Sequence, residues 1–210
     1  MITRGVACLC QLVPFIIMRI ITGKLKGRTI PFDVRKHGDA RVTPARIKEA
    51  AFNILGARLD RLHFLDLFSC SGQIGLEAHS RGARVLLNEP DRRRHGFIST
   101  LLRDWGMERQ VRLANQHAER LLPLLESERQ PFDVIYVDPP YRLQLDGAPS
   151  ALTILSRLSG SVLLAPSAHI LIQHATDLEM PVTSRHLSLC VRKTYGGTSL
   201  SIYRSVCGAE

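Results

Sequence analysis

The segment His63-Phe64-Leu65-Asp66-Leu67-Phe68-Ser69-Cys70-Ser71-Gly72-Gln73-Ile74-Gly75 decides the fold. Its first six residues are typical of a short apolar strand, and a glycine-bearing turn separates them from the helical pattern of residues 76–81. Strand, turn and helix in this order are typical of the first βα crevice of a doubly wound sheet, where nucleotide-like ligands bind. The candidate cofactor-binding residues here are Asp66, Phe68, Ser69, Cys70, Ser71, Gly72 and Gly75.

A second strand over residues 84–88 is followed by Glu89, which lies 23 residues after Asp66. An acid at this distance suits the hydroxyls of a ribose. A dinucleotide site is disfavoured because Cys70 stands where the first glycine of G-x-G-x-x-G would be. S-adenosylmethionine has no phosphate and tolerates a looser turn, and its sulfonium charge is favoured near Asp66. We therefore expect this cofactor, with a dinucleotide oxidoreductase as an alternative that titration with NADH would test.

The tetrapeptide Asp138-Pro139-Pro140-Tyr141 follows the apolar run of residues 132–137. An exocyclic amine on a base is a poor nucleophile because its lone pair is delocalised into the ring. Asp138 and the Pro139 carbonyl can each accept one amine hydrogen, and the two prolines lack competing N–H groups. Tyr141 offers a face on which a base can stack. The four residues are the candidate catalytic set.

Other motifs accompany these two. They are residues 18–28 (MRIITGKLKGR), 42–55 (VTPARIKEAAFNIL) and 193–198 (KTYGGT). Together they resemble the bacterial methyltransferases of the RsmD type, which modify guanine N2 in 16S ribosomal RNA. The resemblance covers nearly all of the chain from Met18 onward, and the combination is specific where each piece alone would be weak.

The resemblance implies an α/β fold of the Rossmann-like class I methyltransferase kind. Its mostly parallel sheet would have seven strands, with a C-terminal antiparallel hairpin and a small basic N-terminal extension. It also implies S-adenosylmethionine as donor and direct methyl transfer to the guanine amine, without a covalent enzyme intermediate. The family usually has Gly where this chain has Cys70, and often Asp or Asn where it has His117. We expect His117 and Ala118 to contact the cofactor's adenine.

Basic charge is concentrated before the cofactor motif. Residues 18–61 contain eleven Lys and Arg against four acidic residues, whereas residues 62–210 are almost neutral; the whole chain carries +9. Phosphate-backbone docking needs such a segment, although a solvated basic face is the simpler alternative. The candidate RNA-binding residues are Arg19, Lys24, Lys26, Arg28, Arg41 and Arg46.

Within residues 18–61, residues 19–31 are predicted to form a β-hairpin and residues 35–38 a polar loop. A helix should start near Thr43, with Thr43 as N-cap, Pro44 at the first helical position, and Arg46 and Lys48 towards solvent. Further along, the pattern predicts helices over residues 92–105, 118–125 and 151–158 and strands over 111–114 and 169–174. Two alternating runs, 187–191 and 200–203, predict the terminal hairpin.

Residues 1–17 are interpreted as a doubtful extension from a start codon placed too early, residues 18–61 as the basic RNA-docking segment, and residues 62–210 as the methyltransferase domain. The apolar run of residues 6–17 is too short to span a bilayer and lacks a clear A-x-A cleavage site. Five cysteines suggest no disulfide framework, and no His or Cys spacing indicates a metal. We expect a cytoplasmic monomer, away from membranes, whose partner is 16S rRNA within an assembling small subunit.

Two alternatives to this function remain open. DNA adenine-N6 methyltransferases carry a similar tetrapeptide, but the chain has no room for a dedicated sequence-reading domain. A non-catalytic RNA-binding assembly factor with a vestigial cofactor pocket is the other, and Cys70 is the feature that supports it.

Overall fold

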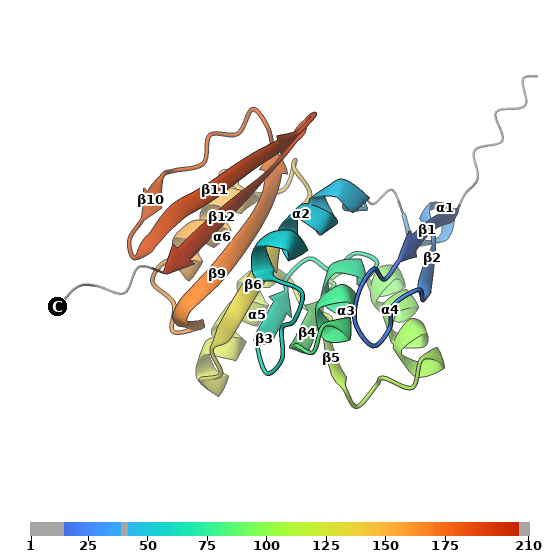
Figure 1. Ribbon diagram of the computed structural model, residues 1–210. Coiled ribbons are helices and arrows are strands. Elements are labelled where there is room, and N and C mark those ends of the chain that lie inside the picture. Colours follow the sequence, from blue (N-terminus) through green and yellow to red (C-terminus); the bar gives the residue numbers. More distant parts are fainter. Residues whose placement is uncertain (1–14, 39–41, 206–210) are drawn as a thin grey trace, which may run out of the picture.

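The computed structural model describes residues 15–38 and 42–205, and Figure 1 shows one twisted sheet at its centre. The sheet has the strand order β10-β11-β12-β9-β6-β3-β4-β5. Five strands are parallel: β3 (His63–Asp66), β4 (Arg84–Asn88), β5 (Val111–Ala114), β6 (Phe132–Val137) and β9 (Leu164–Ala175). The antiparallel remainder is β10 (Thr183–Ser184), β11 (Leu187–Tyr195) and β12 (Thr198–Ser205).

The predicted mostly parallel sheet with a C-terminal antiparallel hairpin is confirmed. The expected number of seven strands is exceeded because β10, only two residues long, adds an eighth at the edge through its pairing with β11. Such a short run carries no alternating pattern from which a strand could be predicted.

Helices cover both faces of the sheet, as the near-continuous apolar strands require. Two core clusters result: in β6, Val134 and Tyr136 belong to one and Ile135 and Val137 to the other. The first cluster includes α2 (Ala45–Leu55), α3 (Gln73–Ser80) and α4 (Arg92–Asp104). The second includes α5 (Ala118–Glu128) and α6 (Ser150–Leu158).

The N-terminal hairpin is confirmed. It consists of β1 (Phe15–Arg19) and β2 (Thr29–Asp33), and the predicted polar loop after it is instead the short helix α1 (Val34–His37), capped by Asp33. Strand β1 begins before Met18, while residues 1–14 of the predicted extension lie outside the described residues. The hairpin and α3 lie side by side in Figure 1.

Helix α2 corrects two predictions. Thr43 is not the N-cap: Pro44 takes that position and the helix begins at Ala45. Lys48 does not face solvent but is 2% exposed, because its turn of α2 packs against the hairpin and α3. Its Nζ donates to the Arg19 carbonyl at 2.6 Å and lies 3.8 Å from Glu77 Oε2.

After β6 the chain makes a small antiparallel pair, β7 (Gln144–Leu145) with β8 (Ala148–Pro149), before entering α6. Across residues 15–38 and 42–205, no helix is both long and apolar enough to cross a bilayer. Over the same ranges, no three His, Cys, Asp or Glu side chains gather in a way that could hold a metal ion.

Candidate active site

The predicted cofactor turn and the tetrapeptide meet at the carboxyl ends of β3 and β6. These strands are parallel neighbours, with Asp66 opposite Tyr136, and the Leu67 N–H donates to the Tyr136 carbonyl at 3.0 Å. Because both strands end here, Asp66 and Asp138 reach the same edge of the sheet. This is the edge where open α/β sheets bind their ligands.

The turn after β3 has two residues with left-handed backbones, Cys70 with φ 51° and Gly72 with φ 79°. Glycine adopts this conformation without steric cost, whereas a cysteine does so under strain. The Ser69 hydroxyl fixes the turn, since it donates to the Asp66 carbonyl and accepts from the Asn88 N–H. The turn therefore leads directly into the N-terminus of α3.

Gly75 lies beneath this turn. A Cβ there would come within 2.1 Å of Leu87 Cδ2, so the glycine lets α3 approach β4 closely. Its N–H donates to Asp66 Oδ2 at 3.0 Å. Gly75 thus shapes the crevice through packing and through Asp66, and is itself fully buried.

Glu89 joins β4 to the turn. Its Oε2 accepts from the Cys70 N–H at 2.8 Å, and its Oε1 accepts from the Asp91 N–H at 2.8 Å. Arg94 Nη2 lies 3.1 Å from the same Oε1. Sequence reasoning missed this ion pair because an Arg triplet at a helix start is usually a solvated surface.

His117 and Ala118 open helix α5, where they differ in exposure. His117 is the N-cap and is exposed, while Ala118 is 3% exposed. His117 lines a surface hollow together with Pro90, Asp91 and Arg92 to Arg94. The neighbouring Asn115 Nδ2 donates to the carbonyls of Glu89 and Pro90, which ties the end of β5 to the end of β4.

In the tetrapeptide, Asp138 Oδ2 accepts a hydrogen bond from the Thr43 hydroxyl at 2.8 Å. The other carboxylate oxygen has no hydrogen-bond partner among residues 15–38 and 42–205. The Pro140 carbonyl is occupied by the Leu143 N–H at 2.8 Å, whereas the Pro139 carbonyl accepts none within that same part of the chain. The two acceptors predicted for an amine are therefore among the oxygens that the described residues leave available.

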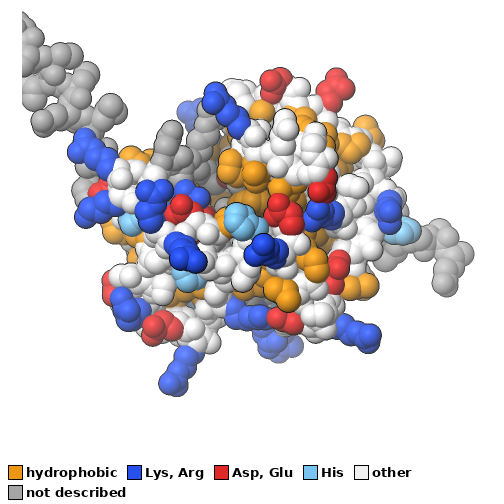
Figure 2. Space-filling model, turned by 180° about the vertical axis from the view of Figure 1, so that it is seen from behind, with side chains coloured by type: hydrophobic (Ala, Val, Ile, Leu, Met, Phe, Trp, Pro, Cys, Tyr) orange, Lys and Arg blue, Asp and Glu red, His pale blue; other side chains and the backbone are white. Residues whose placement is uncertain are grey.

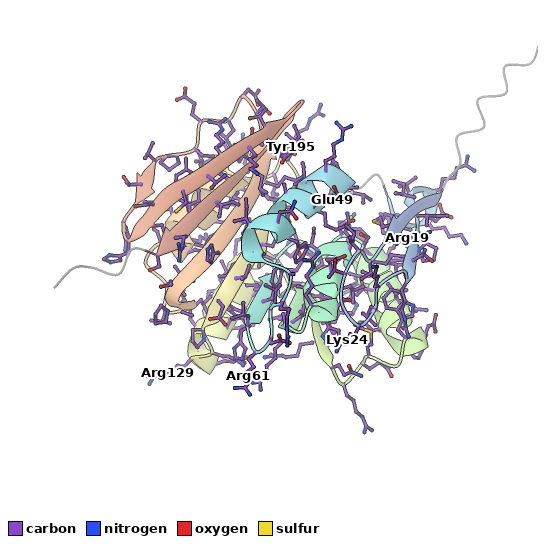
Figure 3. All side chains as sticks on the ribbon, in the orientation of Figure 1. Arg19, Lys24, Glu49, Arg61, Arg129 and Tyr195 are labelled. Atoms are coloured by element: carbon purple, nitrogen blue, oxygen red, sulfur yellow. The ribbon has the colours of Figure 1, made fainter. Side chains whose placement is uncertain are left out.

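Tyr141 is anchored by the C-terminal hairpin. Its hydroxyl lies 2.7 Å from the Thr198 hydroxyl and 3.4 Å from Gln173 Nε2. Tyr141 and Pro139 line a hollow of about 350 Å³ with Gln173 and His174 of β9 and with residues at the start of α6. The KTYGGT motif therefore contacts the tetrapeptide through Thr198. In Figure 3, Tyr195 of this motif lies at the same end of the sheet as Glu49 of α2.

Burial changes the acidity of the groups in the crevice. It raises the pKa of Asp66 to about 7, and the nearby Asp138 and Glu89 carboxylates add to this. Burial likewise raises the pKa of Asp138 to about 7, against the Thr43 hydrogen bond, which lowers it. Burial and Glu89 raise the pKa of Cys70 to about 12, so that the thiol stays protonated at neutral pH.

Five of the candidate RNA-binding residues are exposed, namely Arg19, Lys24, Lys26, Arg28 and Arg46. The sixth, Arg41, lies outside the described residues. The Arg28 guanidinium lies over the Trp105 ring, 5.1 Å from its centroid. In Figure 3, Arg19 and Lys24 lie on the hairpin, whereas Arg61 lies at the far end of the sheet from Tyr195. Lys and Arg on the face shown in Figure 2 are scattered among acidic and uncharged side chains.

Residues 18–204 match the model of a family described as conserved hypothetical protein 95, which is the family of the RsmD-type rRNA methyltransferases. The chain belongs to this family. The resemblance seen in the sequence is thereby confirmed.

Individual relatives agree with this membership. The chain is 31% identical over 191 residues to ribosomal RNA small subunit methyltransferase D of Haemophilus influenzae, covering 90% of this chain and 94% of that one. It is 28% identical over 196 residues to the Escherichia coli protein of the same name, covering 92% of each.

Solved structures show the same fold. A hypothetical protein from Thermus thermophilus superposes with a TM-score of 0.73 at 28% identity, over 88% of this chain and 98% of that one. An RNA methyltransferase from Salinibacter ruber, solved with S-adenosyl-L-homocysteine, superposes with a TM-score of 0.57 over 81% of this chain and 97% of that one. At 13% identity the second likeness concerns the fold alone.

Proposed function

We propose that this protein transfers the methyl group of S-adenosylmethionine to the exocyclic N2 amine of a guanine in 16S rRNA. The observation that carries the proposal is the pair of available acceptors, one oxygen of Asp138 and the Pro139 carbonyl, at the carboxyl end of β6. Membership of the RsmD family and relatives named as small-subunit rRNA methyltransferases support the substrate class.

The residues of the crevice fit a sulfonium cofactor. Two acidic side chains, Asp66 and Glu89, border the turn of residues 69–72 and favour a cation there. A pyrophosphate would face these acids without the glycine pattern that such a group needs. When bound, the cofactor supplies an activated methyl group. Asp66, Glu89 and the turn would hold it. His117 and Ala118, at the start of α5, would contact its adenine.

The chain's own residues would orient the amine. Asp138 accepts one amine hydrogen and the Pro139 carbonyl the other, which turns the lone pair out of conjugation with the ring. Tyr141 stacks on the base, and the hollow beside it receives a base unstacked from the RNA. The cofactor would supply the methyl group to the amine nitrogen with loss of its own S–C bond, and the amine proton would pass to water. The residues named above would contribute mainly by aligning the amine.

The basic hairpin is proposed to dock the RNA. Lys24, Lys26 and Arg28 are exposed on its turn, and the Glu77 carboxylate fixes the turn by accepting from the N–H groups of Ile21 and Thr22 at 2.7 and 3.0 Å. Cations held on a rigid turn suit the phosphate backbone of an assembling subunit. The protein is proposed to act as a cytoplasmic monomer.

Replacing Asp138 tests the catalytic assignment. Asp138→Ala is expected to abolish methyl transfer and to leave S-adenosylmethionine affinity nearly unchanged, as measured by calorimetry. An equal loss of cofactor affinity would contradict the role given to Asp138.

Charge reversal tests the docking surface. Changing Lys24, Lys26 and Arg28 to Glu should weaken RNA binding and reduce its salt dependence, while cofactor affinity stays the same. A control reverses Arg61 and Arg129, which lie outside the hairpin, in the segment before β3 and at the C-cap of α5. Equal effects of the two sets, or no effect of the first, would assign the hairpin charges to an ordinary solvated surface.

A further inference from the structure

We propose that Thr43 is a positioning residue of the methyl-transfer site, which holds Asp138 through its side-chain hydroxyl so that one carboxylate oxygen faces the target amine. This inference rests on the proposed function. It adds to the site a residue from the N-terminal segment, 95 positions before the tetrapeptide.

The geometry assigns the hydroxyl this role. Thr43 Oγ1 donates to Asp138 Oδ2 at 2.8 Å, and Thr43 is only 8% exposed. The residue does not cap α2, since Pro44 is the N-cap and no side chain caps that helix. The Thr43 hydroxyl therefore binds the tetrapeptide and does not cap the helix that follows it.

Thr43 is itself held from the cofactor side. Gln73 Nε2 donates to the Thr43 carbonyl at 2.8 Å, and Gln73 is the first residue of α3, directly after the glycine of the cofactor turn. Gln73 is 3% exposed. Hydrogen bonds therefore run from the cofactor turn through Thr43 to Asp138, and they fix the carboxylate relative to the place where the methyl donor would lie.

The hydroxyl also affects the charge state of Asp138. An ionised carboxylate is a stronger acceptor for an amine hydrogen than a protonated carboxyl, and burial raises the pKa of Asp138 to about 7. The Thr43 hydrogen bond opposes this and lowers the pKa. Among residues 15–38 and 42–205, the titratable groups that interact electrostatically with Asp138 are Asp66 on β3, Cys70 in the turn and Tyr136 on β6. None of these three groups is a cation that could favour the ionised carboxyl, and within the described part of the chain the Thr43 hydroxyl is the side-chain donor that favours it.

Two substitutions separate the hydroxyl from the shape of the side chain. Thr43→Val keeps the branched shape and removes the donor, whereas Thr43→Ser keeps the donor and removes the methyl group. The readouts are the pH dependence of methyl transfer to small ribosomal subunits and the titration of the Asp138 carboxyl carbon, followed by NMR in protein labelled with ¹³C-aspartate. Asp138→Asn assigns the NMR signal.

We expect Thr43→Val to raise the Asp138 midpoint by about one pH unit and to lower kcat about tenfold at neutral pH, since a hydrogen bond to a charged group contributes at about this level. Cofactor affinity should not change. Thr43→Ser should keep the wild-type midpoint and most of kcat. A midpoint unchanged in Thr43→Val, or an equal loss of kcat in Thr43→Val and Thr43→Ser, would overturn the proposal.

The NMR titration does not depend on activity, which keeps this test separate from that of the function. A wild-type protein that methylates no RNA would contradict the proposed function. If the wild type is active but the Asp138 titration midpoint is the same in Thr43→Val as in the wild type, the role given to Thr43 is contradicted while the proposed function stands.

Discussion

At position 70 the turn takes a left-handed backbone conformation while carrying a cysteine. The side chain packs against the first core cluster, and its N–H binds Glu89. The raised pKa of the thiol removes it as a nucleophile at neutral pH. The fold therefore tolerates the backbone strain that Cys70 introduces into the cofactor turn.

Cys70→Gly should relieve that strain. We expect the free energy of unfolding to rise by up to about 1 kcal/mol in denaturant titration, offset in part by lost packing, and cofactor binding to become tighter as the Cβ is removed. Methyl transfer should persist. If the variant bound cofactor normally but transferred no methyl group, the thiol would have a chemical role that this account denies.

Tyr141 provides a second test at single residues. Tyr141→Phe keeps the stacking face and loses the hydroxyl contacts to Thr198 and Gln173, so kcat/KM should fall less than about tenfold. Tyr141→Ala removes the face, and a stacked base contributes about 1–3 kcal/mol, so the loss should be about ten- to a hundredfold. Equal losses in steady-state assays would show that the hydroxyl, and not the ring, matters.

The local turns that carry the candidate site residues could be predicted from the sequence, whereas several contacts made between distant segments could not. The tetrapeptide and the turn follow strands that their own apolar runs reveal. Thr43 and Arg94 were missed because their contacts, to Asp138 and Glu89, depend on how α2 and α4 pack. A Thr before a helix favours the capping interpretation unless its tertiary partner is known.

Among the elements, the hairpin β1–β2 depends on α3 for its position. Glu77 of α3 is 0% exposed and accepts from two hairpin N–H groups, while Lys48 of α2 and Arg81 supply positive charge. Burial lowers the pKa of Lys48, and Glu77 raises it. Three elements therefore meet at one buried carboxylate. This explains why Lys48 is buried, although its position beside the apolar stripe of α2 predicted a solvent-facing side chain.

Glu77→Ala should destabilise the fold by about 3–5 kcal/mol, because it leaves buried cations and hairpin N–H groups without their partner. Chemical denaturation measures this loss. Adding Lys48→Met should recover part of it, since no lysine charge then remains buried. A loss within about 0.5 kcal/mol would mean that the hairpin is not held through Glu77.

For the whole molecule, the raised pKa values of Asp66 and Asp138 make stability depend on pH. Each carboxyl binds its proton more tightly in the folded than in the unfolded chain, so its contribution is fully present below about pH 4 and is lost as pH rises through about 7. The loss is on the order of 1 kcal/mol per pH unit for one group.

Asp66→Asn should remove one such contribution. Compared with the wild type in urea titrations from about pH 4 to 8, the variant should show a shallower decline in the free energy of unfolding, and its relative stability should improve towards the upper end of that range. Parallel curves over this range would show that Asp66 keeps an ordinary pKa in the folded protein.

The proposed methyl transfer to 16S rRNA can be followed directly with a labelled methyl donor. Radiolabelled methyl from S-adenosylmethionine is offered to small ribosomal subunits from cells lacking this gene, with free rRNA and DNA in parallel, followed by nucleoside analysis. We predict label in N2-methylguanosine of 16S rRNA with the wild type and none with Asp138→Ala. Label in DNA adenine, or no label in any of the three substrates while S-adenosylmethionine still binds, would contradict the proposed function.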